Sequence, residues 1–210
     1  MKIAVIGANG KTGKVFVKAA LENGHVIRAG MFRSQYKFPR NRNLTMVSCD
    51  ATMRRDLQEL IGDSEIVVSF IGHTAHSPHR VQTNATTQII QGMSQLHIRR
   101  FISLTGTGAR IAGDIPSWWD TLANKLVYFF DPERVNDGIA HIKVLQQNTD
   151  TIDWTVIRVL KLTNRSCQPY SITLHGPGQL FTSRCTVSKA VLQLINEQST
   201  YIHQAPVISR

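Results

Sequence analysis

The sequence predicts an α/β fold: a Rossmann-like, doubly wound parallel sheet flanked by helices, with a small C-terminal substrate lobe. Short apolar runs of strand type alternate with segments of helical periodicity along the whole chain. Such alternation is typical of parallel strands joined by right-handed crossovers. The 210 residues suit one domain with a large core, so we expect residues 1–210 to form a single domain.

The first half of the chain contains the clearest strand and helix patterns. Gly24 and Gly62 follow helical patterns, where glycine commonly ends a helix. The run at 65–71 is nearly all apolar, as expected for a strand covered on both faces. In chain order, strands are expected at 3–6, 25–32, 44–48 and 65–71, and helices at 11–23, 53–61 and 77–97.

The second half continues the alternation but is interrupted twice. Strands are expected at 100–104, 154–159 and 201–207, and helices at 135–147 and 187–197. An aromatic stretch at 106–131 and a stretch rich in proline and glycine at 163–184 break the pattern. Both follow the carboxyl ends of strands, where ligands bind in such sheets. We therefore expect the substrate lobe to comprise about residues 106–131 and 163–210.

Three glycines follow the first strand and open the first helix. Gly7 allows a sharp turn, Gly10 allows the backbone to approach a phosphate, and Gly13 allows the helix to pack close to the strand. The helix N-terminus then offers free N–H groups and a positive dipole end to an anion. This context predicts a binding site for a dinucleotide pyrophosphate, and the alternative is a plain tight turn.

The end of the second strand indicates which dinucleotide is bound. An NAD site usually places Asp or Glu there, whereas an NADP site needs a cation for the 2′-phosphate. This chain has Arg33 and Ser34 at that point, with Lys37 shortly after, and no acidic residue at 23–49. The arginine offers planar bidentate donors. NADP(H) is favoured over NAD(H), and the alternative for Arg33 is an ordinary exposed loop arginine.

Other strand ends also carry candidate binding residues. Asp50, followed by Ala51, could meet the adenine, or it could be the N-cap of a helix near Met53. Gly72 would let the cofactor lie across the tip of its strand. His73 and His76 make a poor metal site because no carboxylate lies nearby in sequence. We expect a polar loop beside the cofactor there and no metal.

At these residues the chain resembles a known family. The loop of sequence GANGKTG, Arg33 with Ser34, Asp50, Ile71 with Gly72, and residues 104–108 look like an atypical short-chain dehydrogenase/reductase. The similar group is the one that includes biliverdin-IXβ/flavin reductase and the NmrA-like proteins. Segments 141–159 and 173–184 extend the resemblance over essentially the whole chain.

The resemblance implies a role for each matching residue. Those expected to bind the pyrophosphate are Gly7, Asn9, Gly10, Lys11, Thr12 and Gly13. Arg33, with a weaker contribution from Lys37, would bind the 2′-phosphate. Those expected to line the ribose and nicotinamide are Ile71, Gly72, Thr105 and Gly106, with Val159 and Leu160 near the nicotinamide.

The usual catalytic pair of the family is missing. Most short-chain dehydrogenases use Tyr-x-x-x-Lys on the helix before the sixth strand, where the lysine lowers the tyrosine pKa. This chain has Asn136 and Ala140 where that pair is expected. Hydride transfer to a planar flavin, quinone or tetrapyrrole can take its proton from solvent. The sequence therefore favours an NADPH-dependent reductase with a planar acceptor over an ordinary alcohol dehydrogenase.

Weaker candidates could still take part in catalysis. Thr105 could stand where the family has a serine, and His141 could donate a proton, unless it is a solvated helix histidine. The aromatic segment 118–130 could stack a planar acceptor, or Leu126, Val127, Phe129 and Phe130 could pack a helix onto the sheet.

Two other functions are compatible with the same motifs. The missing pair and the basic surface also suit a non-catalytic NADP(H) sensor that binds a protein partner, as in NmrA-like proteins. An epimerase or lyase acting on a nucleotide-linked substrate is disfavoured by the absent tyrosine. The sequence is compatible with both a monomer and a homodimer.

Composition and charge narrow the remaining classes of partner and cellular location. The net charge is +10, but no nucleic-acid motif or aromatic platform accompanies the basic runs, so nucleic-acid binding is disfavoured. No apolar run approaches the ~20 residues that span a bilayer, and the N-terminal segment reads as a core strand instead of a signal peptide. We therefore expect a cytoplasmic protein that does not bind membranes. Cys49, Cys167 and Cys185 are scattered, and we expect reduced thiols without disulfides.

Overall fold

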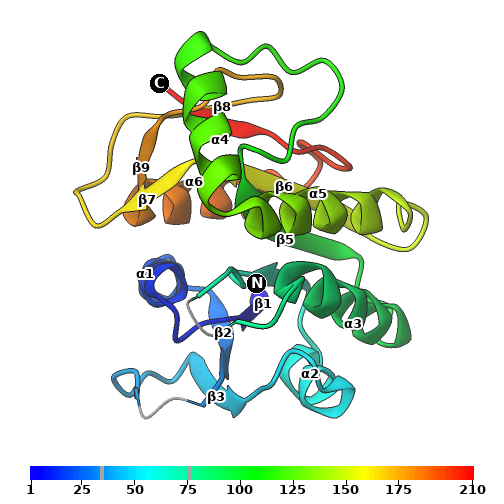
Figure 1. Cartoon of the computed structure of the whole chain (residues 1–210). Helices are drawn as coiled ribbons and strands as arrows, with labels where there is room; N and C mark the ends of the chain where they lie inside the picture. The colour runs from blue at the N-terminus through cyan, green and yellow to red at the C-terminus, as the bar shows by residue number, and fades with distance from the viewer. Residues whose placement is uncertain (34–35, 75–76) are drawn as a thin grey trace.

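The computed structural model describes residues 1–33, 36–74 and 77–210 and shows one large sheet between two layers of helices (Figure 1). The strands are β1 (Lys2–Ile6), β2 (Val26–Met31), β3 (Leu44–Ser48), β4 (Ile66–Ser69), β5 (Arg100–Gly106), β6 (Asp153–Val159), β7 (Lys161–Thr163), β8 (Ser171–Thr173), β9 (Phe181–Ser183) and β10 (Val207–Ser209). The helices are α1 (Lys11–Glu22), α2 (Arg54–Ile61), α3 (Val81–Gln95), α4 (Trp118–Phe130), α5 (Pro132–Gln146) and α6 (Arg184–Asn196). Within the described ranges, no helix has the length and apolarity to cross a bilayer.

The order of the strands confirms the predicted fold class. The main sheet runs β3-β2-β1-β4-β5-β6-β10-β8, and its pairs are parallel except for β8 against β10. The chain moves outward from β1 in one direction and from β4 in the other, so the switch point lies between these two strands. In sheets of this order, ligands bind outside the carboxyl ends of the strands at that point.

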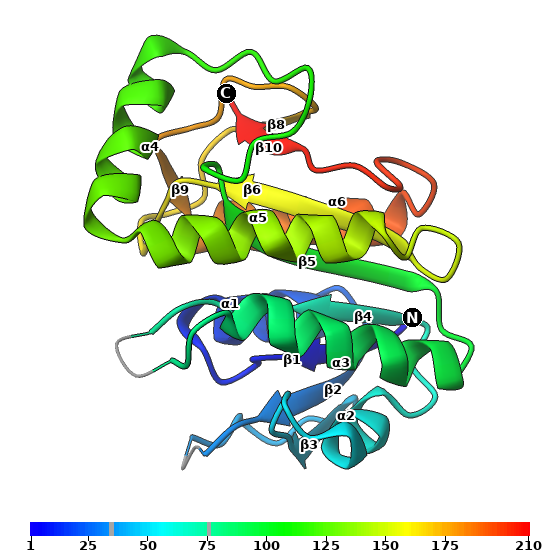
Figure 2. The same cartoon turned by 45° about the vertical axis from the view of Figure 1, so that its right-hand side comes forward.

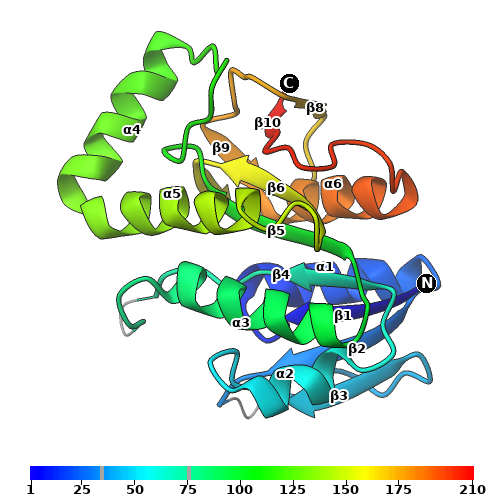
Figure 3. The same cartoon turned by 90° about the vertical axis from the view of Figure 1, so that its right-hand side faces the viewer.

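Apolar cores on both faces of the sheet explain the apolar strands. In β1, Ile3 and Val5 join the core under α1 and α6, while Ala4 and Ile6 join the core under α2, α3 and α5. Figures 2 and 3 show α3 and α5 in front of the sheet, with α6 behind it. Because both faces are covered, β1 and β4 are apolar at nearly every position.

The prediction for the start of the third long helix was wrong. A helix was expected from residue 77, but α3 begins at Val81, after Arg80 in the left-handed conformation with φ of 57°. The N-terminal amides of α3 are bound by a carboxylate on α5, which fixes where the helix can start. That partner lies 55 residues away in the chain and gives no local sequence signal.

The prediction for the last strand was also displaced. A strand was expected at 201–207, but β10 covers only Val207–Ser209. Tyr201 and His203 both have φ of 56°, which no strand residue adopts, so residues 201–203 form a turn instead. The short strands β7, β8 and β9 were not predicted, because three-residue strands carry no periodic signal.

The expectation of three reduced cysteines was wrong. Cys167 and Cys185 form a disulfide that joins the loop after β7 to the start of α6. The spacing of the cysteines in the sequence did not indicate this disulfide. The two residues come close because β7, before Cys167, pairs with β9, just before Cys185. Cys49 is a free, buried cysteine, and burial raises the pKa of its thiol to about 12.

Candidate functional site

The parallel sheet brings the predicted site residues to one edge. The glycine loop follows β1, Arg33 follows β2, and Asp50 follows β3. Gly72 follows β4, and Gly106 is the exposed last residue of the otherwise buried β5. These positions are far apart in sequence but share an edge because the carboxyl ends of parallel strands lie together.

Close packing around the first loop requires glycine. Gly7 has φ of 73°, in the left-handed region. A Cβ at Gly13 would stand 2.2 Å from the carbonyl oxygen of Gly7 and 2.8 Å from the Cα of Ala8. No side chain fits there, so α1 lies directly against the loop.

The first turn of α1 is left available to an anion. Its N-cap, Gly10, has no side chain that could accept a hydrogen bond from the helix amides. By contrast, α4, α5 and α6 are capped by Ser117, Asp131 and Ser183. The uncapped positive end of α1 is the arrangement that binds phosphate. Lys11 is exposed beside it, and Thr12 is buried.

The side chain of Asn9 has a positioning role that the sequence did not show. Its Nδ2 donates to the carbonyl of Phe32 at 2.9 Å, and its Oδ1 accepts from the amide of Phe32 at 3.4 Å. This pair of bonds joins the glycine loop to the end of β2. It therefore places Arg33 beside the glycine loop.

The end of β2 carries several cations. The guanidinium of Arg33 is exposed and lies 5.0 Å from the centre of the Phe32 ring. Lys37 is exposed nearby in sequence. Lys14 of α1, which sequence inspection missed, places its Nζ 3.6 Å from the centre of the Tyr36 ring. Ser34, also predicted to bind the cofactor, lies outside the described residues.

The segment after β3 is held by its own side chain. The carboxylate of Asp50 accepts from the amide and the hydroxyl of Thr52 at 2.9 and 2.7 Å. The N-cap of α2 is Met53, without a side-chain hydrogen bond, so the alternative of Asp50 as that N-cap was wrong. A contact of Asp50 or the half-buried Ala51 with adenine stays a prediction.

Gly72 and Gly106 are exposed at the ends of β4 and β5, and we call the open space above them the cradle. A Cβ added at Gly72 would meet no atom within 4 Å, and one at Gly106 only the amide of Gly108 at 4.0 Å. The chain therefore leaves room above these strand ends, where a dinucleotide is predicted to lie. Val159 is buried at the end of β6, and Leu160 directly after it is half-buried.

Gln82 of α3 joins the two strand ends beneath this cradle. Its Nε2 donates to the carbonyls of Ile71 and Leu104 at 3.0 and 2.9 Å. The hydroxyl of Thr105 donates to Gln82 Oε1 at 3.4 Å, and Thr105 is buried. A Cβ at Gly138 of α5 would lie 2.6 Å from that hydroxyl. Thr105 therefore points between β5 and α5, away from the open edge, and its position does not favour proton donation.

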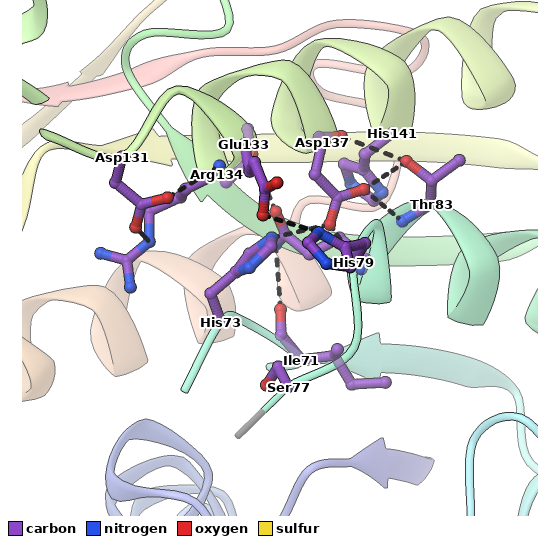
Figure 4. Close-up of polar contacts among 12 residues, drawn as sticks. Ile71, His73, Ser77, His79, Thr83, Asp131, Glu133, Arg134, Asp137 and His141 are labelled. Atoms are coloured by element: carbon purple, nitrogen blue, oxygen red, sulfur yellow. Dashed lines mark hydrogen bonds and ion pairs between the residues drawn. The ribbon is translucent and has the colours of Figure 1, made fainter. Parts of the chain in front are cut away.

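Asp137 of α5 is the centre of a buried polar cluster (Figure 4). Its carboxylate accepts from the amides of Gln82 and Thr83 at 2.9 and 3.0 Å and from the Thr83 hydroxyl. His73 Nε2 lies 2.8 Å from the same carboxylate. Burial alone would raise the pKa of Asp137, but the bonds from Thr83, Gln82 and His73 hold it below its usual value. Asp137 thus caps α3 from another helix.

This cluster fixes the loop after Gly72. His73 was predicted to lie in a polar loop beside the cofactor, and its pairing with Asp137 anchors that loop to α5. A second contact, His79 Nδ1 to Glu133 Oε2 at 2.7 Å, joins the same two segments. His76 lies outside the described residues. In the part of the chain that is described, no three His, Cys, Asp or Glu side chains gather as metal ligands would.

His141 is part of the interior, so its interpretation as a solvated histidine was wrong. It is 2% exposed, with Nδ1 2.8 Å from the Thr86 hydroxyl and Nε2 2.9 Å from the Ser103 hydroxyl. Burial lowers the pKa of its ring to about 4. Both ring nitrogens are engaged inside the protein, which disfavours proton donation to a substrate.

The buried face of α5 does not include the two positions at which the catalytic pair of the family was expected. Asn136 is exposed and Ala140 half-buried, whereas Asp137 and His141 are buried. Where the resemblance implied the catalytic pair, the chain therefore presents an acidic helix cap and a neutral histidine to α3 and β5.

Comparisons with known proteins agree with this geometry. A family model described as NAD(P)H-binding matches residues 7–198. No curated protein matches the chain. Among solved structures, a short-chain dehydrogenase/reductase from Veillonella parvula in complex with NADP is 17% identical, with a TM-score of 0.80, covering 100% of this chain and 94% of that one.

Two reductase structures are similar at the level of the fold. An anaerobillin reductase from Escherichia coli O157:H7 is 16% identical, with a TM-score of 0.77, covering 99% of this chain and 96% of that one. A proposed NADH-flavin reductase from Streptococcus pneumoniae is 18% identical, with a TM-score of 0.75, covering 99% and 98%. Identities this low establish a common fold only.

The burial of His141 predicts a pH dependence of stability. Its folded pKa of about 4 lies below the ordinary value of 6.5, so on acidification the unfolded chain takes up this proton first. Stability is therefore lost as pH falls from 6.5 towards 4, by about 2–3 kcal/mol for this group. Urea unfolding at neutral and acidic pH should show a smaller loss for His141→Gln than for the wild type. Equal losses would contradict this assignment.

The cradle predicts a separation of folding from cofactor binding. Gly72→Val should leave the melting temperature nearly unchanged, because the added Cβ meets no atom of the chain. It should weaken NADPH binding at least tenfold, because the side chain would enter the space assigned to the cofactor. Gly13→Ala is the contrasting variant, because its Cβ clashes with backbone and should lower stability. Unchanged NADPH affinity in Gly72→Val, measured by calorimetric titration, would refute the cradle.

Proposed function

The chain belongs to the NAD(P)H-binding family, and from this premise we propose that it is an NADPH-dependent reductase that transfers hydride to a planar acceptor. The acceptor class is a flavin, quinone or linear tetrapyrrole. The observation that carries the proposal is the site edge itself: an uncapped α1, an open cradle at Gly72 and Gly106, and cations at the end of β2.

The charge at the end of β2 supports NADP(H) over NAD(H). Asn9 holds Phe32, and so Arg33, next to the phosphate-binding loop. An arginine there matches the doubly charged 2′-phosphate, whereas a ribose hydroxyl would call for a carboxylate. Lys14 and Lys37 add positive charge to the same region, and 23–49 contains no acidic residue.

The chain's own residues bind and orient more than they transfer protons. When bound, NADPH supplies the hydride, and the acceptor takes up that hydride together with one proton. The amides of α1 would hold the pyrophosphate, while Gln82 and Asp137 fix the strand ends and the loop after Gly72. Thr105 and His141 are engaged in the interior, so the proton comes from solvent. Planar acceptors that delocalise the added charge suit such a site.

Similarity to the anaerobillin reductase and to the proposed flavin reductase supports the same acceptor class, although it extends only to the fold. The alternative is a non-catalytic NADP(H) sensor that binds a protein partner. This alternative is favoured by the absence of the Tyr-x-x-x-Lys pair from α5. A sensor would bind oxidised and reduced cofactor tightly and turn over none of the acceptors.

Arg33→Ala tests the cofactor assignment. Loss of a charge-assisted contact of about 1.5–3 kcal/mol should weaken NADPH about tenfold to a hundredfold and leave NADH nearly unchanged. Arg99→Ala, an exposed arginine just before the amino end of β5 and so at the opposite edge of the sheet, is the matched control and should change neither. Equal weakening of both cofactors by Arg33→Ala would refute the 2′-phosphate role.

An acceptor panel tests the reaction. NADPH oxidation, followed by the absorbance of the reduced nicotinamide, should accelerate with FMN, riboflavin, a quinone or biliverdin. A simple ketone should give no acceleration, because its reduction requires a positioned proton donor. Tight NADPH binding with no turnover across the panel would reject the reductase in favour of the sensor.

A further inference from the structure

Helix α4 exposes its apolar side chains and buries its polar ones. Its buried residues are Asp120 and Asn124. The side chains exposed on the helix are Trp118 (65%), Trp119 (54%), Leu122 (46%), Leu126 (52%), Tyr128 (52%), Phe129 (78%) and Phe130 (79%). The expectation that Leu126, Phe129 and Phe130 pack a helix onto the sheet was therefore wrong. A soluble helix ordinarily has the opposite arrangement.

Hydrogen bonds fix this orientation of the helix. Asn124 Nδ2 donates to the carbonyl and carboxylate of Asp120, both at 2.9 Å, and Asn124 Oδ1 accepts from Thr107 at 3.1 Å. On the neighbouring turn, Arg110 Nη2 donates to the Thr121 hydroxyl at 3.2 Å. Rolling α4 to bury its apolar face would break the bonds to Thr107 and Arg110 and would expose the Asp120 carboxyl, whose pKa burial raises.

The exposed side chains form a continuous stripe. Trp118, Leu122, Leu126 and Phe129 recur at helical spacing and so lie along one side of the helix. The Trp118 and Trp119 rings stack with centres 3.6 Å apart at one end, and the Phe129 and Phe130 rings lie 5.3 Å apart at the other. In Figure 3, α4 stands at the left margin of the molecule, away from the sheet. Large apolar side chains exposed together on one helix mark an interaction surface.

The net charge of the chain favours an anionic occupant. Near α4 the exposed charges roughly balance: Lys125 lies on the helix, Asp131 pairs with Arg134 at 3.3 Å, and Glu133 contacts His79. Asp114 pairs with the buried Arg158. The whole chain carries a net charge of +10, which would repel a second copy and attract an anionic surface.

We propose that α4 docks on the surface of an anionic lipid bilayer. The stripe combines tryptophan, tyrosine and phenylalanine, the side chains that favour the boundary between headgroups and acyl chains. The helix would lie in the plane of the membrane with its apolar face inserted by roughly 5–10 Å. This surface binding is distinct from spanning the membrane, although it departs from the expectation that the protein has no contact with membranes. It does not depend on the proposed reductase activity.

Vesicle flotation of the full chain tests the proposal. The protein should float with vesicles of phosphatidylcholine and phosphatidylserine, float poorly with phosphatidylcholine alone, and be released by high salt. Phe129→Ser with Phe130→Ser should weaken binding more than tenfold, because two phenylalanines leave the lipid. Met53→Ser is the matched control, since Met53 is 56% exposed and is the N-cap of α2, a helix that lies far from α4 in Figures 1 to 3.

Tryptophan fluorescence gives a second readout. Trp118 and Trp119 are exposed and Trp154 is buried, so anionic vesicles should shift the emission of the first two to shorter wavelength. Melting temperatures of the variants, expected to match the wild type because the replaced side chains are exposed, exclude misfolding as the cause of lost binding.

Three results would overturn the proposal. The first is no flotation with anionic vesicles at low salt. The second is equal binding by the double phenylalanine variant and Met53→Ser. The third is a stable dimer in lipid-free light scattering that the double variant converts to a monomer, since a second copy would then be what covers α4.

Discussion

The close approach of α1 to the loop after β1 is the constraint on which the site depends. Only glycine at position 13 permits it, because a Cβ would overlap the Gly7 carbonyl. The approach places the helix N-terminus at the strand-end edge, with a glycine cap that leaves its amides available. Through Asn9 the same loop holds the end of β2, so the position of Arg33 follows from the packing of α1.

A second constraint holds the other half of the edge. Asp137, a buried residue of α5, caps α3 and holds His73. Gln82, at the capped end of α3, joins β4 to β5. The buried face of α5 thus serves to fix geometry, and binding and orientation dominate the chemistry proposed for this site.

The strands β1 to β6, most helices and the tight glycine loop could be predicted from the sequence because their signals are local. The spacing of Gly7, Gly10 and Gly13 reflects the backbone of one turn, and the apolar run of β4 reflects burial on both faces. The start of α3, the Cys167–Cys185 disulfide and the burial of His141 were missed. Each depends on a partner in another element, 18 to 55 residues away.

The sequence by itself determined the fold class, the tight glycine loop and the positive charge at the end of β2, since each depends on residues close together in the chain. The tertiary structure alone decided which face of α4 and α5 is buried. A helical pattern shows that an apolar stripe exists but not what covers it. In α5 the buried face carries Asp137 and His141, and in α4 bonds to Thr107 and Arg110 turn the aromatic stripe outward.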